Sequence, residues 1–305
     1  MQNFSDGVAV ITGGGSGLGK AFSLAAASRG MKIVIADVQL DTLDKAVSEL
    51  RERGTEVIGV RTDVSKSADV QALADAAMDA FGKVNLLFNN AGVTASGLVW
   101  ENTERDWEWL LGVNLYGVIH GLRIFTPLML QAAKADPNYQ GHIVNTASMA
   151  GLLAGVGSGI YSVSKHAVFG LSEALYQDLN LLTEQISCSV LCPSYVPTAI
   201  GNSERNRPEA LAATGPLTPA QLVAKQISQE SIITGSVTAE QVAQLTFDAI
   251  ERQCFYVYTH PETLLAVRNR FDNIVAQKNP PLSFEGNAKR SSRRTRLMEV
   301  LRAQP

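Results

Sequence analysis

Short apolar runs alternate with amphipathic stretches along most of the chain. The runs "VAVIT" (8–12) and "KIVIAD" (32–37) are rich in Val and Ile, which favour strands. The stretch "LDTLDKAVSELRER" (40–53) has the spacing of an amphipathic helix. Strands joined through helices lie parallel, with right-handed crossovers that cover both faces of the sheet. The alternation therefore predicts an α/β fold, a single doubly wound domain with a central parallel β-sheet and helices on both faces.

The same alternation predicts the remaining elements. Further strands are expected at 56–64, 85–92, 141–148 and 186–194. Helices are expected from about residue 17 and over 68–81, 103–132 and 160–180. A helix over 238–252, whose Thr238 and Gln241 have capping-box spacing, and a last strand over 254–260 follow. We therefore expect residues 1–260 to form one domain.

Two segments lie outside this alternation. Residues 199–237 are polar, and an irregular segment of that length in a compact domain is usually a lid or is disordered. We interpret it as a substrate lid. Residues 261–305 are a C-terminal extension, whose basic run "KRSSRRTR" (289–296) is expected to be a solvated tail rather than an anion site.

Composition excludes several classes of protein. The 305 residues carry a net charge of −3 and the pI is near 5.9, so no basic bias indicates a nucleic-acid or anionic-membrane partner. The N-terminus lacks the basic and apolar regions of a signal peptide, and no uninterrupted apolar run is long enough to cross a bilayer. Cys188, Cys192 and Cys254 are expected to be reduced, buried thiols, and no metal-ligand cluster is predicted. We therefore expect a cytoplasmic protein.

A glycine-rich turn follows the first strand, in "VAVITGGGSGLGKAFSLA" (8–25). Gly13, Gly17 and Gly19 would let the backbone turn tightly, approach a pyrophosphate and pack helix against strand, with Ser16 and Leu18 between them. A glycine-rich stretch alone is weak evidence. Its place between a strand and a helix is the context that indicates a Rossmann-type dinucleotide site.

Asp37 indicates which dinucleotide binds. It ends the second strand, 24 residues after Gly13, where an acidic side chain would meet the adenine ribose hydroxyls of NAD. A carboxylate there repels a 2′-phosphate. No Arg or Lys follows in "DVQLD", Ser16 stands where a cation could reach a phosphate, and Lys20 is poorly placed to replace it. The sequence therefore favours NAD, with NADP the less favoured cofactor.

Tyr161 and Lys165 lie four residues apart in "GIYSVSKHAVFG" (159–170), at the start of an expected helix. One turn of helix places their side chains on the same face. Taken alone, this spacing is common by chance and fits a packed tyrosine beside a solvated lysine. Other motifs in the chain decide between that interpretation and a catalytic one.

Seven motifs occur in the order typical of one family, over about residues 5–200. They are "TGGGSGLG" (12–19), "DV" (63–64), "NNAG" (89–92), "VNL" (113–115), "NTAS" (145–148), "YSVSK" (161–165) and "CPSYVPT" (192–198). In these motifs the chain resembles the short-chain dehydrogenase/reductase family. One departure is visible: many members have Pro-Gly after the sixth strand, whereas this chain has Pro193-Ser194.

The resemblance implies catalytic roles for four residues. Tyr161 would be the general acid/base, with a pKa lowered from about 10 by the Lys165 ammonium and the positive nicotinamide ring. Lys165 would also bind the nicotinamide ribose. Ser148 would hold and polarise the substrate oxygen. Asn114 would bind a water that links Lys165 to solvent.

The resemblance also implies contacts with the cofactor beyond the glycine loop and Asp37. Expected contacts to the adenine, its ribose and the nicotinamide are Asp63, Val64, Asn90, Ala91, Gly92, Pro193, Val196 and Thr198. The implied reaction transfers a hydride between NAD(H) and a secondary alcohol or ketone, without a metal.

The residues next to the catalytic motifs suggest the substrate. Alongside Ser148 and Tyr161, the expected lining residues are Val93, Thr94, Met149, Ala150, Leu152, Leu153, Val156 and Tyr195. They are mostly apolar and none is charged, which favours a bulky apolar or aromatic small-molecule substrate.

Two alternatives stay open. An NADPH-dependent ketone reductase would differ in the ribose pocket, and a non-catalytic NAD(P)-binding sensor could use the same fold. Family members are usually dimers or tetramers, so the resemblance also implies a homodimer or homotetramer.

Overall fold

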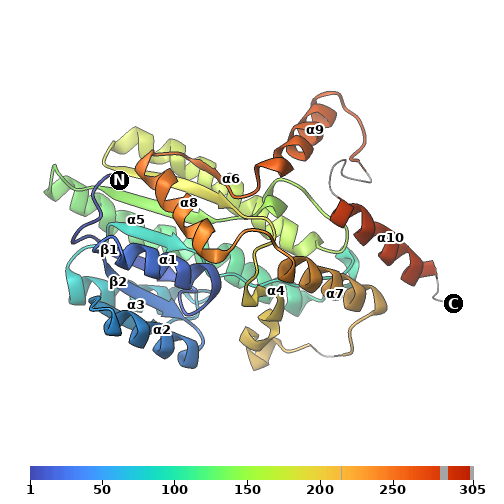
Figure 1. The fold of residues 1–305 in the computed structure, drawn as a ribbon, viewed down its shortest axis with the longest axis horizontal. Coiled ribbons are helices and arrows are strands. Elements are labelled where there is room, and N and C mark those ends of the chain that lie inside the picture. The colour runs from blue at the N-terminus through green and yellow to red at the C-terminus, as the bar shows by residue number, and fades with distance from the viewer. Residues whose placement is uncertain (214, 282–287, 303–305) are drawn as a thin grey trace.

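The computed structural model describes residues 1–213, 215–281 and 288–302. Within them, seven parallel strands form one sheet in the order β3-β2-β1-β4-β5-β6-β7, which confirms the predicted doubly wound α/β fold (Figure 1). The strands are β1 (Val8–Thr12), β2 (Lys32–Asp37), β3 (Val57–Arg61), β4 (Leu86–Asn89), β5 (Gly141–Thr146), β6 (Ile186–Cys192) and β7 (Tyr256–Tyr258). The order reverses between β1 and β4, where such sheets place their ligands.

Helices α1, α2 and α8 cover one face of the sheet, and α3, α5 and α6 cover the other. The helices are α1 (Gly17–Ala27), α2 (Leu40–Glu52), α3 (Ser67–Phe81), α4 (Glu104–Leu111), α5 (Gly117–Ala135), α6 (Gly159–Leu182), α7 (Pro219–Ile233), α8 (Ala239–Glu251), α9 (Leu264–Val275) and α10 (Ala288–Arg302). Thr238 caps α8 through the predicted capping box with Gln241.

Strand β1 shows why the sheet is buried on both sides. Val8 and Val10 belong to a core cluster with α3, α5 and α6, whereas Ala9 and Ile11 belong to a second cluster with α1, α2 and α8. Side chains alternate between the faces of a strand, so a continuous apolar run supplies both cores. The two clusters fix the strand ends that carry the site.

The long helix expected over 103–132 is interrupted. A π-helical turn over Gly112–Tyr116 joins α4 to α5. By length and composition, Glu104–Ala135 is the single stretch in the described chain that could cross a membrane, although no such stretch was expected from sequence. Core helices of water-soluble folds pass the same test. Val118 and Phe125 of this stretch lie in the core against the sheet, and 39% of its most apolar window is buried inside the molecule.

The lid segment 199–237 is more regular than expected. It contains short 3₁₀ turns at Ala199–Asn206 and Glu209–Leu211, and then helix α7. Thr218 and Gln221 form a capping box at the start of α7, a signal that the sequence carries and that the prediction of an irregular segment overlooked.

The C-terminal extension packs on the domain. Figure 1 shows α10 beside α7, at the end of the molecule far from the N-terminus. Within α10, Arg293 and Leu297 are buried, and Leu297 joins Ala220 and Ala224 of α7 in a small apolar cluster. The prediction of a solvated basic tail is therefore wrong for this part of the chain.

Candidate active site

A cavity of about 990 Å³ opens at the carboxyl ends of the central strands. Most predicted site residues line it. Those from the cofactor and catalytic motifs are Gly13, Ser16, Gly17, Leu18, Asp37, Asp63, Val64, Asn90, Ala91, Gly92, Ser148, Tyr161, Lys165, Pro193, Val196 and Thr198. The predicted substrate-side residues that line it are Val93, Thr94, Met149, Ala150, Leu153, Val156 and Tyr195. Three predicted residues do not: Gly19, Asn114 and Leu152.

The glycine loop has the predicted tight geometry. Gly13 and Gly17 adopt φ angles of 62° and 52°, which L side chains rarely adopt. A Cβ on Gly13 would lie 2.9 Å from the Cα of Ala91. A Cβ on Gly19 would lie only 2.1 Å from the carbonyl oxygen of Gly13, so this glycine packs helix against loop and does not face the cavity.

The amino end of α1 points at the cavity as an uncapped helix terminus. Ser16 at the N-cap makes no side-chain capping bond, and the first turn contains no acidic residue. The helix N-terminus provides unpaired N–H groups and the positive end of the helix dipole. This arrangement fits a diphosphate.

Asp37 lies beside this loop. Its two carboxylate oxygens accept hydrogen bonds, each of 3.0 Å, from the backbone N–H groups of Gly15 and Gln39. Lys20 instead forms an ion pair with Glu49, with 2.6 Å between Nζ and Oε2. Strand β2 thus contributes a negative charge, the Asp37 carboxylate, to this end of the cavity.

Ser148 and Tyr161 meet above the end of β5. The Ser148 hydroxyl accepts a bond from the Ala150 N–H (3.1 Å) and donates to the Pro193 carbonyl oxygen (3.2 Å), and it lies close enough to Tyr161 to lower the pKa of that phenol. Tyr161 lies in the first turn of α6. The two hydroxyls therefore face one point in the cavity.

Lys165 lies one turn further along α6 and is 3% exposed. Its Nζ donates a 2.8 Å bond to the carbonyl oxygen of Thr146 and lies 5.8 Å from the centre of the Tyr161 ring. Burial lowers the pKa of Lys165 to about 8, against a smaller opposing effect of Cys192. The predicted pairing of Tyr161 and Lys165 on one helix face is present in the structure.

The acidity of Tyr161 in the chain alone is set mainly by burial. Burial raises the pKa of Tyr161 to about 12, Ser148 lowers it, and Tyr195 raises it further. Loss of solvent around the phenol disfavours its charged form. The expected lowering of this pKa by Lys165 together with the nicotinamide ring stays a prediction for the cofactor-bound protein.

Asn114 is fully buried in the π-helical turn, outside the cavity. Its Oδ1 accepts a 2.8 Å bond from the Val93 N–H, and its Nδ2 donates to the Val93 carbonyl oxygen (3.0 Å) and the Ser164 hydroxyl (3.1 Å). Asn114 therefore joins the loop after β4 to α6, the helix of Tyr161 and Lys165. Its predicted part in a proton relay stays a prediction.

Leu152 corrects the substrate-side prediction. Leu152 and Leu153 are 4% and 2% exposed and belong to the same core cluster under α6, but of the two only Leu153 lines the cavity. The 3₁₀ turn Met149–Gly151 precedes both residues and sets which side chain faces inward.

Several cavity residues do not belong to the motifs recognised in the sequence. Ser203, Arg207, Ser228 and Ile232 come from the predicted lid, Trp109 comes from α4, and Arg293 and Arg294 come from α10. The expectation that no charged residue lines the substrate end is thus wrong. Arg293 and Arg294 lie far along the chain from the last strand, β7, which ends at Tyr258. No local sequence pattern predicts that they line the cavity.

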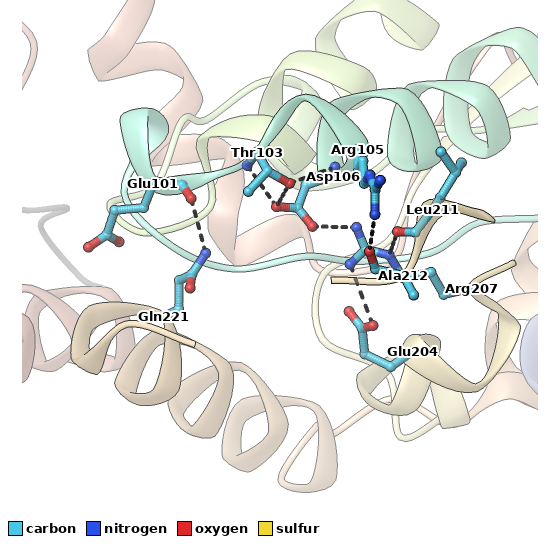
Figure 2. A network of polar contacts seen from close by, with 9 residues as sticks. All are labelled: Glu101, Thr103, Arg105, Asp106, Glu204, Arg207, Leu211, Ala212 and Gln221. Atoms are coloured by element: carbon cyan, nitrogen blue, oxygen red, sulfur yellow. Dashed lines mark hydrogen bonds and ion pairs between the residues drawn. The ribbon is translucent and has the colours of Figure 1, made fainter. Parts of the chain in front are cut away.

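Arg207 of the lid segment 199–237 forms an ion pair with Asp106 of α4 and so links the two elements (Figure 2). Its Nη2 lies 2.6 Å from Asp106 Oδ1, and its Nε donates a 2.6 Å bond to the Leu211 carbonyl oxygen. The exposed Glu204 lies 3.6 Å from its Nη1, and the guanidinium lies over the ring of Trp109. The ion pair closes one wall of the cavity.

Two further contacts reinforce this wall. Arg105 donates a 3.2 Å bond to the Ala212 carbonyl oxygen, and Gln221 of α7 donates one of 3.3 Å to Glu101, as Figure 2 shows. Asp106 is bound by both Thr103 and Arg207, which hold the pKa of its carboxyl below the ordinary value against the effect of burial. Within the described ranges, no group of three or more His, Cys, Asp or Glu side chains could hold a metal ion.

Comparison with known proteins agrees with this geometry. The family model for short chain dehydrogenases matches residues 7–209. The chain is similar to a CLA biosynthesis dehydrogenase/reductase of Lactiplantibacillus plantarum, with 35% identity over 92% of this chain and 97% of that relative. It is also similar to a C alpha-dehydrogenase of a Sphingobium species, with 32% identity over 92% of this chain and 89% of the relative.

A solved structure matches more strongly. It is a short chain dehydrogenase/reductase from Burkholderia phymatum in complex with NAD, which is 53% identical and covers 93% of this chain and 100% of its own, with a TM-score of 0.90. The matches span the glycine loop, the strand ends and the Ser148, Tyr161 and Lys165 positions described above. This chain therefore belongs to the short-chain dehydrogenase/reductase family of oxidoreductases.

Proposed function

We propose that this protein transfers a hydride between NAD(H) and a secondary alcohol or its ketone, with a bulky apolar or aromatic substrate. The observation that carries the proposal is the convergence of Ser148, Tyr161 and Lys165 on one cavity that also contains an uncapped helix terminus suited to a diphosphate. A site built only to sense a nucleotide does not need the two hydroxyls.

The preference for NAD is supported by two observations. The Asp37 carboxylate lines the cavity beside the glycine loop, where it would accept bonds from ribose hydroxyls and repel a 2′-phosphate. The similar protein from Burkholderia phymatum was crystallised with NAD. Bound at these residues, NAD would supply the hydride acceptor for alcohol oxidation.

The side chains of this chain would handle the proton. Ser148 would hold the substrate oxygen, and Tyr161 would take its proton during oxidation and return it during reduction. A phenol with a pKa of about 12 is almost fully protonated at neutral pH, so little phenolate is present to accept the substrate's proton. A cationic ring beside the phenol would favour the phenolate. Lys165 would bind the ribose hydroxyls with the N–H groups not used on Thr146.

The cavity walls support a bulky substrate. Beside the catalytic residues they are formed by Val93, Trp109, Met149, Leu153 and Ile232. Large apolar side chains of this kind favour an aromatic or aliphatic body over a sugar. The lid and its Asp106–Arg207 ion pair would exclude water once the substrate is bound.

The proposal is tested first by titrating the purified protein with NADH and NADPH. Aromatic, alicyclic and long-chain secondary alcohols are then offered with NAD at about pH 9, where loss of the alcohol proton is favoured. We expect tight NADH binding and turnover that Tyr161→Phe abolishes. Tyr176→Phe, an exposed position on the same helix, is the matched control. Tight binding without any turnover would instead favour a sensor.

We also propose that the protein is a homodimer or homotetramer. Helix α6 carries several exposed apolar side chains, Val163, Tyr176, Leu181 and Leu182, which are 50%, 38%, 83% and 69% exposed. Contact between subunits would remove this apolar surface from water. Light scattering with size-exclusion chromatography tests this, and a monomer at micromolar concentration would contradict it.

A further inference from the structure

We propose that Arg293 and Arg294 of α10 form an anion subsite at the substrate end of the cavity, so that the substrate carries a carboxylate at the end opposite its reacting alcohol. The inference rests on the proposed function for the chemistry at Tyr161. It adds the chemical class of the group at the far end. It also assigns a role to the C-terminal helix.

Arg293 is a buried cation that binds only neutral oxygens. It is 6% exposed, and its Nη2 donates to the carbonyl oxygens of Gly157 (3.0 Å) and Ala224 (3.4 Å). The side chain of Tyr195 lies close enough to raise the pKa of Arg293 against the larger, opposite effect of burial. Among the residues that the structure describes, no carboxylate pairs with it, and its buried Nε has no hydrogen-bond partner.

Such a charge is costly without an anion. Buried charges in proteins are normally paired, and burial lowers the pKa of Arg293, which reflects the same penalty. Arg293 lines the cavity, so an anion that enters the cavity can supply the missing partner. The planar guanidinium is suited to a carboxylate.

The neighbouring Arg294 strengthens the case. It lines the same cavity and, within the described chain, takes part in no ion pair. The other arginines at this end differ. Arg207 is neutralised by Asp106, and Arg205 is an exposed residue that binds the carbonyl oxygens of its own turn. Glu108 of α4, an exposed carboxylate, also lines the cavity, and α10 supplies two cations that, within the described chain, have no carboxylate partner.

The position of Arg293 favours the substrate over the cofactor as the ligand. Arg293 donates to the carbonyl oxygen of Gly157, four residues before Tyr161 at the start of α6, and Tyr195 lines the same cavity. Asp37, which marks the adenine end, lies on β2 on the other side of the strand-order reversal. A ligand that joins Tyr161 to Arg293 runs past the apolar walls. The substrate class is thus an apolar hydroxy acid or keto acid.

The test compares matched substrates that differ in one group. The substrates are 4-(1-hydroxyethyl)benzoate and 3-[4-(1-hydroxyethyl)phenyl]propanoate, each beside its neutral primary amide. With NAD, we expect the wild-type kcat/KM to favour at least one carboxylate over its amide by about tenfold or more, the usual effect of a charge-assisted bond. Arg293→Gln and Arg294→Gln should each reduce the ratio of kcat/KM for the acid to kcat/KM for its amide to about twofold or less.

A third variant separates charge at the subsite from charge on the helix. Arg296→Gln also removes a cation from α10, but Arg296 pairs with Glu230 and does not line the cavity. It should keep the carboxylate preference. Equal kcat/KM for acid and amide in the wild type, or equal loss in all three variants, would overturn the proposal. Arg293 also holds α10 to α7 through the Ala224 carbonyl oxygen. If Arg293→Gln does not fold, Arg294→Gln is the variant that tests the proposal.

Calorimetry keeps the two proposals distinguishable. If NADH binds but no alcohol turns over, the dehydrogenase proposal fails. The subsite is then tested by titrating 4-phenylbutanoate and 4-phenylbutanamide into the NADH-bound protein. Binding of the acid alone, lost in Arg294→Gln and kept in Arg296→Gln, would support the subsite. Absence of binding, or equal binding of acid and amide, would reject it.

Discussion

The ammonium of Lys165 donates a 2.8 Å hydrogen bond to the carbonyl oxygen of Thr146, the last residue of β5. The bond holds a buried cation at the carboxyl end of the strand that leads into Ser148. It explains how a lysine can be kept beside Tyr161 at a position where solvent does not stabilise its charge. Burial of the Lys165 ammonium therefore lowers the stability of the fold and at the same time holds a positive charge beside Tyr161.

The first prediction is that Lys165→Met stabilises the fold while abolishing turnover. Burial lowers the lysine pKa from 10.5 to about 8, which corresponds to a penalty of about 3 kcal/mol below pH 8, and loss of the Thr146 bond returns about 1 kcal/mol of it. We expect the free energy of unfolding at pH 7 to rise by about 2 kcal/mol. Denaturant unfolding measures it.

The sign of the pH dependence gives an independent check. The unfolded chain holds the Lys165 proton between pH 8 and 10.5 and the folded chain does not, so the wild type should gain stability as pH rises through this window. Lys165→Met should lack that gain. Lys83→Met, at an exposed position, is the control and should keep it. A less stable Lys165→Met protein at pH 7 would contradict the prediction.

The second prediction concerns the acidity of Tyr161. The pKa of about 12 reflects burial without a cationic ring nearby, so NAD⁺ should lower it by at least about one unit, and NADH, whose ring is neutral, should lower it less. The ultraviolet difference between wild type and Tyr161→Phe during a pH titration reports this phenol. A pKa that does not respond to NAD⁺ would leave Tyr161 unsuited to be the base.

The third prediction is that Asp37→Asn relaxes the choice of cofactor. The amide keeps the size of the side chain and can still accept a bond from the loop, but it no longer repels a 2′-phosphate. We expect NADH to bind about tenfold more weakly and NADPH more tightly than to the wild type. Fluorescence titration with both reduced cofactors measures the ratio, and an unchanged ratio would refute the assignment of Asp37.

The cofactor end of the site could be predicted because its signals are local. Gly13 and Gly17 need positive φ angles, and Asp37 ends a strand whose apolar pattern is plain. Tyr161 and Lys165 share a helix face by spacing alone. In each case a few consecutive residues determine the geometry, so the sequence contains the information.

The substrate end could not be predicted because it depends on packing between distant segments. Nothing in the run around Arg293 shows that α10 docks on α7, and of the adjacent buried residues Leu152 and Leu153 only the second lines the cavity. The pKa of Tyr161 also depends on the balance between burial and charge, which composition does not give. The sequence shows the kinds of groups present but not how far each is removed from water.

The last prediction concerns the ion pair that closes the lid. Asp106→Ala should raise KM for a bulky alcohol about tenfold and change KM for a small alcohol less than about twofold, because only the bulky substrate needs the closed wall. The side chains of Arg207 and Asp106 are 6% and 13% exposed, so the guanidinium would lose its buried partner and the free energy of unfolding should fall by about 3 kcal/mol.

Two comparisons isolate this ion pair. Glu204→Gln removes the exposed partner of Arg207 and should cost less than about 1 kcal/mol. The pKa of Asp106 is held below its ordinary value of 3.8, so its contribution is present above that pH and is lost as pH falls below it, and stability near neutral pH should not vary through this group. If Asp106→Ala raised KM equally for small and bulky alcohols, the wall would act on the cofactor or on the fold as a whole and would not select the substrate.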